Sequence, residues 1–328
     1  MLFILLAVMF VFLSGCTLKN NNSSTYKIRL NEVTRSVFYA PQYVAMGLGY
    51  FKDENLDIIL STAEGSDKTM AAVLSSQADI GLLGSSAVIS VCAQGKENSP
   101  KIFAGLTCRD GSFLMGRSSE FSWNKLKGKS IIAGRKGGMP EMTLEYILKK
   151  HGLDIANDVN LINNIQFNLM GIAFSRGIGD YVPLFEPVLS LMESEKENCH
   201  SLIPLGCECE KMTYTCYCAN SQYLKENPEI IKRFTRAIYR AQKWIKNNST
   251  REIARVILPY FLDLNKEMAE KCVGNYILAS VWPDSPLINE SEFEMAQKIM
   301  ISAGELKEKI DIDKVVDNKI ADEVVSCE

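Results

Sequence analysis

Apolar and polar residues recur with two different periods along the chain, and these periods predict strands separated by helices. Short alternating or continuous apolar stretches bounded by Gly, Pro, Asn or Asp are typical of β-strands. They lie at residues 28–33, 56–60, 79–83, 101–106, 112–116, 129–133, 161–165 and 178–185. Helices are expected at residues 42–51, 67–77, 85–94 and 140–151. Strands that alternate with helices indicate an α/β fold.

The last third of the chain has a mainly helical pattern. After Pro228, apolar residues from Ile231 to Ile245 recur at a spacing that places them on one helix face. Asn227 is expected to cap this helix, as Asp67 is expected to cap the earlier helix at 67–77. Further helices are predicted at residues 250–261, 266–282 and 290–304.

The N-terminus carries an unbroken apolar run at residues 2–13, followed by Ser14, Gly15 and Cys16. Twelve apolar residues are too few to span about 30 Å of hydrocarbon as a helix, but they suit a secretory signal. A cysteine at this point resembles the bacterial lipobox, although no Lys or Arg precedes the run. We therefore expect a signal peptide at 1–15, with a lipidated Cys16 and a flexible tether at 16–26.

Composition is that of an ordinary globular protein, with 47% hydrophobic and 23% charged residues. The net charge of -3, with both signs interspersed, gives no basic surface for nucleic acid. No second apolar stretch is long enough for a membrane span, so the membrane link depends on the lipid anchor. The sequence gives no reason to expect a cofactor.

Several motifs together resemble a known family. Residues 36–45 read SVFYAPQYVA, Gly-Tyr-Phe follows at 49–51, and SQADIGL stands at 76–82. Gly-Asp-Tyr at 179–181 and Phe-Glu-Pro at 185–187 complete the set. Their order and spacing are similar to those of binding proteins for thiamin-pyrimidine precursors, riboflavin, alkanesulfonates, taurine and nitrate. These are the substrate-binding components, often lipoproteins, of ABC transporters.

This resemblance implies a type II periplasmic-binding fold, with two mixed sheets flanked by helices and a cleft between two lobes. One lobe would hold residues 27–112 and 219–328, and the other would hold 113–218. The protein would be a monomer at the outer face of the bacterial cytoplasmic membrane. Its partners would be a small-molecule ligand and the permease and ATPase subunits of an importer, and the cleft would close by hinge motion.

Candidate ligand-binding residues follow from where ligands meet α/β lobes, namely the carboxyl ends of strands and the starts of the next helices. Three segments occupy such positions. Their candidate residues are Arg35, Phe38, Tyr39, Ser85, Ser86, Gly137, Gly138 and Met139. The two glycines would let backbone approach a ligand closely, and the helix start would offer N–H groups, unless they form only a tight turn.

The other candidates also have structural alternatives. Phe38 and Tyr39 could stack on a planar ring or pack against the next helix, and Arg35 could bind an anion or remain solvated. Ser85 and Ser86 could contact a polar ligand or cap the helix.

Two acidic residues, Asp180 and Glu186, are expected to contribute from the second lobe. Glu186 lies in the Glu-Pro pair that lines the cleft in the family, whereas Asp180 could instead cap a turn. A buried carboxylate repels an anion unless it is compensated. The cleft is therefore expected to favour a mainly neutral heteroaromatic, such as a thiamin-type pyrimidine or a flavin, over a sulfonate or nitrate.

The competing hypothesis is an enzyme, because a fungal branch of the family synthesises the thiamin pyrimidine. In that branch Gly-Leu is followed by a lysine, with a histidine four residues later. Here Leu83 and Ala87 stand at those positions. Neither residue can form a Schiff base or supply an imidazole, so the sequence predicts a binding protein and no enzyme.

Four cysteines form two C-x-C pairs, Cys207 with Cys209 and Cys216 with Cys218. If the pairs faced each other in a hairpin, four thiolates could bind zinc. C-x-C differs from the usual C-x-x-C knuckle, and disulfides are an alternative in an oxidising compartment. We expect no metal site here, and the pairs are interpreted mainly as inert or redox-variable thiols.

Overall fold

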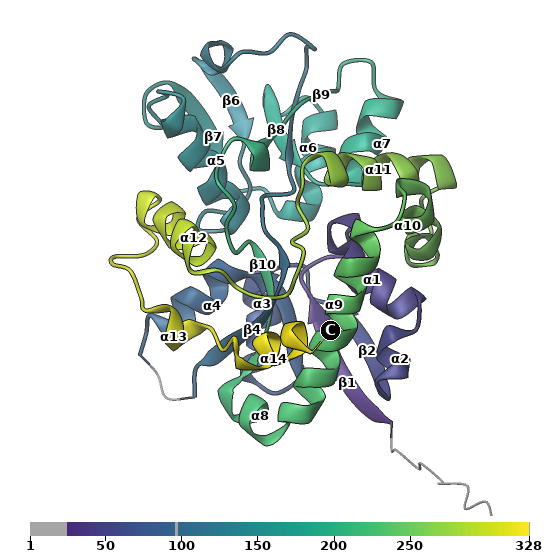
Figure 1. Cartoon of the computed structure of the whole chain (residues 1–328). Helices are drawn as coiled ribbons and strands as arrows, with labels where there is room; N and C mark the ends of the chain where they lie inside the picture. The colour runs from purple at the N-terminus through teal and green to yellow at the C-terminus, as the bar shows by residue number, and fades with distance from the viewer. Residues whose placement is uncertain (1–24, 96–97, 328) are drawn as a thin grey trace, which may run out of the picture.

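The computed structural model describes residues 25–95 and 98–327, which form two mixed five-stranded sheets flanked by helices (Figure 1). The strands are β1 (Tyr26–Glu32), β2 (Leu56–Thr62), β3 (Ile80–Gly84), β4 (Pro100–Thr107), β5 (Phe113–Gly116), β6 (Lys129–Ile132), β7 (Val159–Ile162), β8 (Tyr181–Leu184), β9 (His200–Pro204) and β10 (Thr215–Asn220).

The α-helices are α1 (Ala40–Gly47), α2 (Tyr50–Asp53), α3 (Ser66–Leu74), α4 (Ser85–Cys92), α5 (Met139–Lys150), α6 (Met170–Ser175), α7 (Val188–Glu195), α8 (Ser221–Glu226), α9 (Pro228–Lys246), α10 (Thr250–Ile257), α11 (Lys266–Leu278), α12 (Glu290–Ser302), α13 (Ile312–Val315) and α14 (Lys319–Ser326). Single 3-10 turns are η1 (Val37–Tyr39), η2 (Trp123–Leu126), η3 (Phe167–Leu169), η4 (Leu205–Cys207) and η5 (Leu258–Tyr260).

The first sheet has the strand order β2-β1-β3-β10-β4. β1 pairs in parallel with β2 and β3, whereas β10 pairs antiparallel with β3 and β4. All five residues of β3 are buried. A continuous apolar run such as this one suits a central strand whose two faces are both covered.

The second sheet repeats this plan with the order β7-β6-β8-β5-β9. β6 pairs in parallel with β7 and β8, and β5 pairs antiparallel with β8 and β9. The chain passes from the first sheet to the second between β4 and β5, and it returns between β9 and β10. The expected return at residue 219 lies inside β10, so the crossing precedes Thr215.

The C-terminal helices extend across both sheets (Figure 1). α11 contacts α7 beside the second sheet and η1 beside the first, and α12 contacts both α4 and α5. Lys149 Nζ of α5 also donates a hydrogen bond to the Ser302 carbonyl of α12 at 2.7 Å. Two lobes on either side of a cleft, each built on a mixed sheet, confirm the predicted fold class.

Several predicted details differ from the structure. The helix expected at 42–51 is two helices, because Gly49 adopts a φ of 77° between α1 and α2. The prediction that Asp67 caps α3 is wrong, since the N-cap is Gly65 and Asp67 lies in the first turn. Asn227 is the N-cap of α9, but its side chain donates to the Tyr223 carbonyl instead of accepting from the helix.

The described residues contain no helix that combines the length and apolar character needed to cross a bilayer. The apolar run at 2–13, Cys16 and most of the tether lie outside the described residues. The predicted signal peptide and lipidation therefore remain predictions from the sequence.

Candidate ligand-binding cleft

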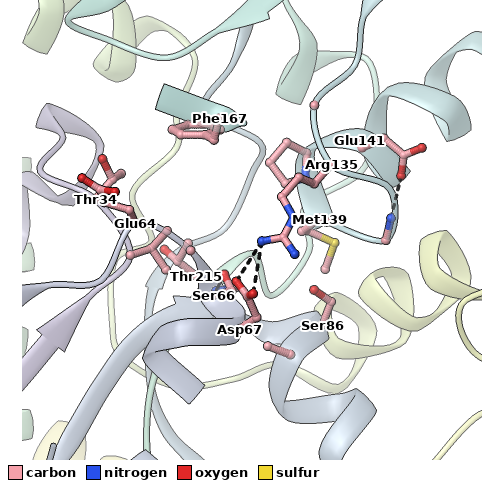
Figure 2. Close-up of a pocket in the computed structure, with 18 of the residues that line it drawn as sticks. Thr34, Glu64, Ser66, Asp67, Ser86, Arg135, Met139, Glu141, Phe167 and Thr215 are labelled. Atoms are coloured by element: carbon pink, nitrogen blue, oxygen red, sulfur yellow. Dashed lines mark hydrogen bonds and ion pairs between the residues drawn. The ribbon is translucent and has the colours of Figure 1, made fainter. Parts of the chain in front are cut away.

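A cavity of about 740 Å³ lies between the two lobes (Figure 2). Its walls are formed where β1, β2, β3, β6 and β8 end and the following segments begin, together with the start of β10. This is the position at which open α/β sheets hold their ligands. The cavity lies within the size range of small-molecule binding sites.

One side of the cavity is aromatic. Phe38, Tyr39, Phe167, Phe185 and Tyr214 all contribute to its lining. The Phe38 ring centroid is 5.4 Å from that of Phe185 and 5.7 Å from that of Tyr214, and Phe185 is 5.3 Å from Phe167. These five rings, named here the aromatic wall, come from both lobes. Phe38, Tyr39 and Tyr214 are 2–4% exposed, whereas Phe167 is 39% exposed. A planar ligand would meet mainly the exposed ring of Phe167.

An ion pair crosses the cleft between the two lobes. Arg135 extends from the segment after β6 toward Asp67 at the start of α3, and its Nη1 lies 3.1 and 3.3 Å from the two carboxylate oxygens (Figure 2). Both side chains are more than half exposed. The pair joins the two lobes, and because both side chains are exposed, solvent screens it.

The structure brings six of the predicted site residues to the cavity. Its lining includes Phe38, Tyr39, Ser86, Gly137, Gly138 and Met139. The remaining predicted residues lie elsewhere and have protein partners. Arg35 is half-exposed and points its Nε at Glu32 Oε1, 3.3 Å away, and Ser85 Oγ donates to the Thr213 carbonyl at 2.5 Å. Asp180 accepts hydrogen bonds from both the N–H and the hydroxyl of Ser130, each at 2.8 Å.

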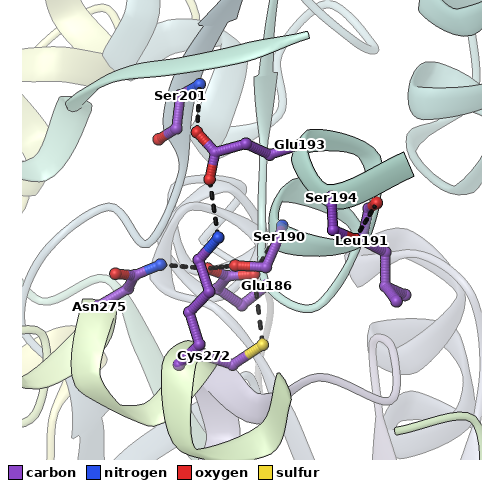
Figure 3. A network of polar contacts seen from close by, with 9 residues as sticks. Glu186, Ser190, Leu191, Glu193, Ser194, Ser201, Cys272 and Asn275 are labelled. Atoms are coloured by element: carbon purple, nitrogen blue, oxygen red, sulfur yellow. Dashed lines mark hydrogen bonds and ion pairs between the residues drawn. The ribbon is translucent and has the colours of Figure 1, made fainter. Parts of the chain in front are cut away.

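Glu186 is buried, with 1% of its surface exposed, but its carboxylate is not part of the cavity lining. It accepts hydrogen bonds from Ser190 Oγ at 2.7 Å, from the Ser190 N–H at 3.1 Å and from Asn275 Nδ2 at 2.6 Å (Figure 3). Cys272 Sγ lies 3.4 Å away. Since Asn275 and Cys272 belong to α11, the carboxylate joins α7 to α11 instead of facing the cleft.

Three charged residues of the site were missed from the sequence. Asp67 and Arg135 form the crossing pair, and Glu141 lines the cavity from the first turn of α5. Glu141 is 2% exposed and accepts the Gly137 N–H at 3.1 Å. Burial raises its pKa to about 7, and the nearby Glu145 carboxylate adds to the rise. An acidic residue in a helix's first turn is so common that the sequence offered no signal here.

The C-x-C pairs do not form the hairpin that the metal hypothesis required. Cys216 and Cys218 are buried in β10 between β3 and β4, while Cys207 ends η4 and Cys209 follows it. The nine cysteines in the described part of the chain are free thiols. Burial raises the pKa of Cys209 to about 12 and that of Cys216 well above its ordinary value. No cluster of three or more potential metal ligands occurs in residues 25–95 and 98–327.

Comparison with known proteins identifies related sequences. Residues 37–251 match the family described as NMT1/THI5 like. YtlA of Bacillus subtilis (strain 168), provisionally named a binding protein, is 42% identical over 302 residues, 92% of this chain and 90% of YtlA. The 4-amino-5-hydroxymethyl-2-methylpyrimidine phosphate synthase of Candida albicans (strain WO-1) is 30% identical over 226 residues, 63% of each protein.

Among solved structures, the alkanesulfonate-binding protein SsuA from Xanthomonas axonopodis pv. citri, bound to MOPS, matches with a TM-score of 0.71. The match covers 90% of this chain and 99% of SsuA at 14% sequence identity, so it bears on the fold alone. The family match covers more than half of the chain, and YtlA aligns along nearly all of it. The chain therefore belongs to the NMT1/THI5-like family and has its two-lobed periplasmic-binding fold.

Proposed function

We propose that the chain is the extracytoplasmic solute-binding component of an ABC importer and that it captures a small heteroaromatic molecule in its cleft. The family and the similarity to YtlA support a binding role. Delivery would be to permease and ATPase subunits in the membrane. Thiamin-type pyrimidines and flavins are the ligand types that fit this proposal.

The aromatic wall is the observation that carries the choice of ligand. Five rings surround one side of a cavity of about 740 Å³, and Phe167 remains 39% exposed at its edge. Planar π-systems bind such surfaces through area burial and offset or edge-to-face ring contacts.

A binding role without catalysis is supported by Leu83 and Ala87, which stand where the fungal synthases have a lysine and a histidine. Leu83, at the lysine position, is fully buried in β3, and its carbonyl oxygen lies 3.7 Å from Cys216 Sγ. Ala87, at the histidine position, lines the cavity with a methyl group. Neither side chain can act as a nucleophile or a base.

The membrane anchor in this proposal is a lipid on Cys16, followed by the polar residues 19–24 as a tether. It would hold a soluble two-lobed protein beside its permease at the outer face of the membrane. Fatty-acid labelling of the expressed chain, compared with Cys16→Ser, measures this directly, since the variant should take up no label.

Calorimetry and thermal shift of the purified chain test the ligand class. The ligands are 4-amino-5-hydroxymethyl-2-methylpyrimidine, riboflavin, taurine, methanesulfonate and nitrate, and a true ligand should raise Tm by mass action. We expect a heteroaromatic to bind and Phe167→Ala to weaken it about threefold to tenfold, the loss of about 0.5–1.5 kcal/mol of ring contact.

Leu169→Ala is the matched control for this experiment. Leu169 lies in the same 3-10 turn, is 45% exposed and does not line the cavity, so its truncation should leave affinity unchanged. Stabilisation by taurine, methanesulfonate or nitrate alone would favour the anion-binding alternative. If no compound binds, the solute-binding proposal itself loses its support.

A further inference from the structure

A row of four aromatic rings leads from the cavity to the first connection between the lobes, residues 108–112 between β4 and β5. Phe167 is its exposed end, and its ring centroid lies 5.3 Å from that of Phe185. Phe185 is 5.4 Å from Phe38, and Phe38 is 5.7 Å from Tyr214. Since Phe38 and Tyr214 are buried, this row, named here the ring row, has an exposed end in the cavity and a buried base.

Phe38 packs directly on the backbone of the first connection, at Gly111. A Cβ on Gly111 would lie within 3.0 Å of three carbons of the Phe38 ring. The φ angle of this glycine lies outside the left-handed region, so its backbone conformation does not itself require a glycine. The close approach of the ring is therefore the reason that position 111 cannot carry a side chain.

Asp110, the preceding residue, binds the other ring of the base. Its carboxylate is buried, and its Oδ2 accepts a hydrogen bond from the Tyr214 hydroxyl at 2.7 Å. Its Oδ1 accepts the Ser112 N–H at 2.6 Å and also the Ser112 hydroxyl. These three donors compensate the loss of water around the carboxylate. Asp110 does not line the cavity, so it acts on the site only through Tyr214.

Tyr214 belongs to the second connection, residues 205–214 between β9 and β10, and its backbone is fixed on both sides. Its N–H donates to the Thr107 carbonyl at 3.2 Å, and its own carbonyl accepts the Ser85 N–H at 2.9 Å. With the backbone held, the remaining freedom is that of the side chain. The bond from its hydroxyl to Asp110 therefore sets the direction of the ring.

We propose that Asp110 is a positioning residue for ligand binding, although it does not touch the ligand. Asp110 and Gly111 fix the two rings at the base, Tyr214 and Phe38. Close-packed side chains do not shift independently, so the contacts along the ring row carry this position to Phe167 in the cavity. The inference rests on the proposed function, because it needs a planar ligand that binds the exposed end of the row.

Isothermal titration calorimetry of the purified chain with 4-amino-5-hydroxymethyl-2-methylpyrimidine and with riboflavin tests this role. Tyr214→Phe removes the bond to Asp110 and keeps the ring, whereas Asp110→Asn turns an amide NH₂ toward one of the existing donors. Each variant populates the arrangement that binds ligand less, so affinity for the probe that binds should fall about threefold to tenfold. The double variant should lose little more than the stronger single variant, because both changes remove the same bond.

Tyr43→Phe is the matched control. The Tyr43 hydroxyl donates to Glu32 Oε2, also at 2.7 Å, and both side chains are buried in the first lobe without lining the cavity. This variant loses an equivalent bond between a phenol and a carboxylate, so its Tm should fall as that of Tyr214→Phe does. Its ligand affinity should remain that of the wild type, which separates a positioning role from a contribution to stability alone.

Gly111→Ala tests the other contact at the base, because its methyl group must displace the Phe38 ring. We expect a loss of affinity similar to that of Asp110→Asn. Gly116→Ala is its control, since a Cβ there would lie 2.9 Å from a carbon of the Tyr181 ring in the second lobe, outside the cavity lining. Overpacking at Gly116 should leave affinity unchanged.

Nuclear magnetic resonance of the free chain with ¹³C-labelled phenylalanine rings measures the positions directly, without any ligand. In Asp110→Asn and in Gly111→Ala, the signals of the three phenylalanines of the ring row should shift from those of the wild type. In Tyr43→Phe and Gly116→Ala they should stay in place.

The outcomes separate this inference from the proposed function. Unshifted ring signals in Asp110→Asn, or equal losses of affinity in Tyr214→Phe and Tyr43→Phe, overturn the positioning role while leaving a heteroaromatic carrier intact. If neither probe binds the wild type, the proposed function is contradicted. The spectra of the free chain then decide by themselves whether Asp110 positions the rings.

Discussion

At the scale of single residues, Glu141 is a buried acid whose charge state should affect stability. It is 2% exposed, and burial, reinforced by Glu145, raises its pKa to about 7. Its native pKa lies above its unfolded value, so it stabilises the fold below about pH 4.5, and that contribution is lost as the pH rises through about 7. Glu141→Gln should therefore be more stable than wild type at pH 8 by up to about 3 kcal/mol.

Urea unfolding at pH 4.5, 6 and 8 measures this difference. The two proteins should have similar stability at pH 4.5 and should separate progressively toward pH 8, because only the wild type buries a charge there. Glu145→Gln is the comparison variant, since it removes one cause of the raised pKa but leaves burial in place. At pH 8, Glu145→Gln should also increase the free energy of unfolding, but by less than Glu141→Gln does. If the stability of wild type and that of Glu141→Gln changed in parallel with pH, burial would not raise the pKa of Glu141 as expected.

The sequence predicted residues that line the cavity by backbone position better than by side-chain chemistry. Ser86 and Met139 were found because strand ends and helix starts gather at one edge of a sheet. Arg35, Asp180 and Glu186 lie next to such positions, but their charges found protein partners that only the packed structure reveals. A charged side chain close to a cleft pairs with protein groups of opposite charge or with hydrogen-bond partners wherever the fold places them within reach.

At the scale of elements, the sequence predicted eight of the ten described strands and the longer helices. It missed β9, β10 and the short helices α6, α7, α8, α13 and α14, and it placed the ends of elements less accurately. Continuous apolar runs such as that of β3 identified central strands, because both of their faces are buried. The Cys-rich segment was harder to assign from its local pattern. A hairpin of two strands was the condition that zinc binding would have required, and only β10 is a strand, while η4 belongs to the connection between lobes. Local pattern could not show that β10 pairs with β3 and β4, which are distant in sequence.

The junction of α7 and α11 gives a prediction at this scale. Each carboxylate oxygen of Glu186 accepts at least one strong hydrogen bond, from Ser190 or Asn275, and no donor is needed at that position (Figure 3). Glu186→Gln would turn an amide NH₂ toward existing donors. We expect a loss of about 1–3 kcal/mol in the free energy of unfolding, measured by urea denaturation.

Glu193→Gln is the matched control for that junction. Glu193 also joins α7 to α11, through Lys271 at 2.8 Å, but both side chains are partly exposed. Solvent screening limits such a pair to about 0–1 kcal/mol. Equal losses of unfolding free energy in Glu186→Gln and Glu193→Gln would mean that the buried Glu186 network stabilises the packing of α11 no more than the exposed Glu193–Lys271 pair does.

At the scale of the whole molecule, the two segments that connect the lobes, one between β4 and β5 and the other between β9 and β10, pack against each other. Arg109 Nη1, in the first connection, donates to the carbonyl oxygens of Gly206 and Cys209 in the second, each at 2.8 Å. A Cβ on Gly206 would overlap the carbonyl oxygen of Asp110 and lie 3.1 Å from Arg109 Cβ. Because one clashing atom is backbone, the segments must separate to admit even a methyl group.

Gly206→Ala should therefore act on the relation between the lobes. We expect a lower Tm, with a loss of about 1–3 kcal/mol for the overpacked contact, and a change in the small-angle scattering profile as the connections move apart. Gly274→Ala in α11 is the control, because its nearest contact would be an ordinary 3.8 Å from Thr250. Helix propensity should make that variant equally or more stable. Since residues of both lobes line the cavity, Gly206→Ala should also weaken ligand binding, although no cavity residue has changed. Unaltered scattering and affinity would instead show that the connections yield locally and do not set the geometry of closure.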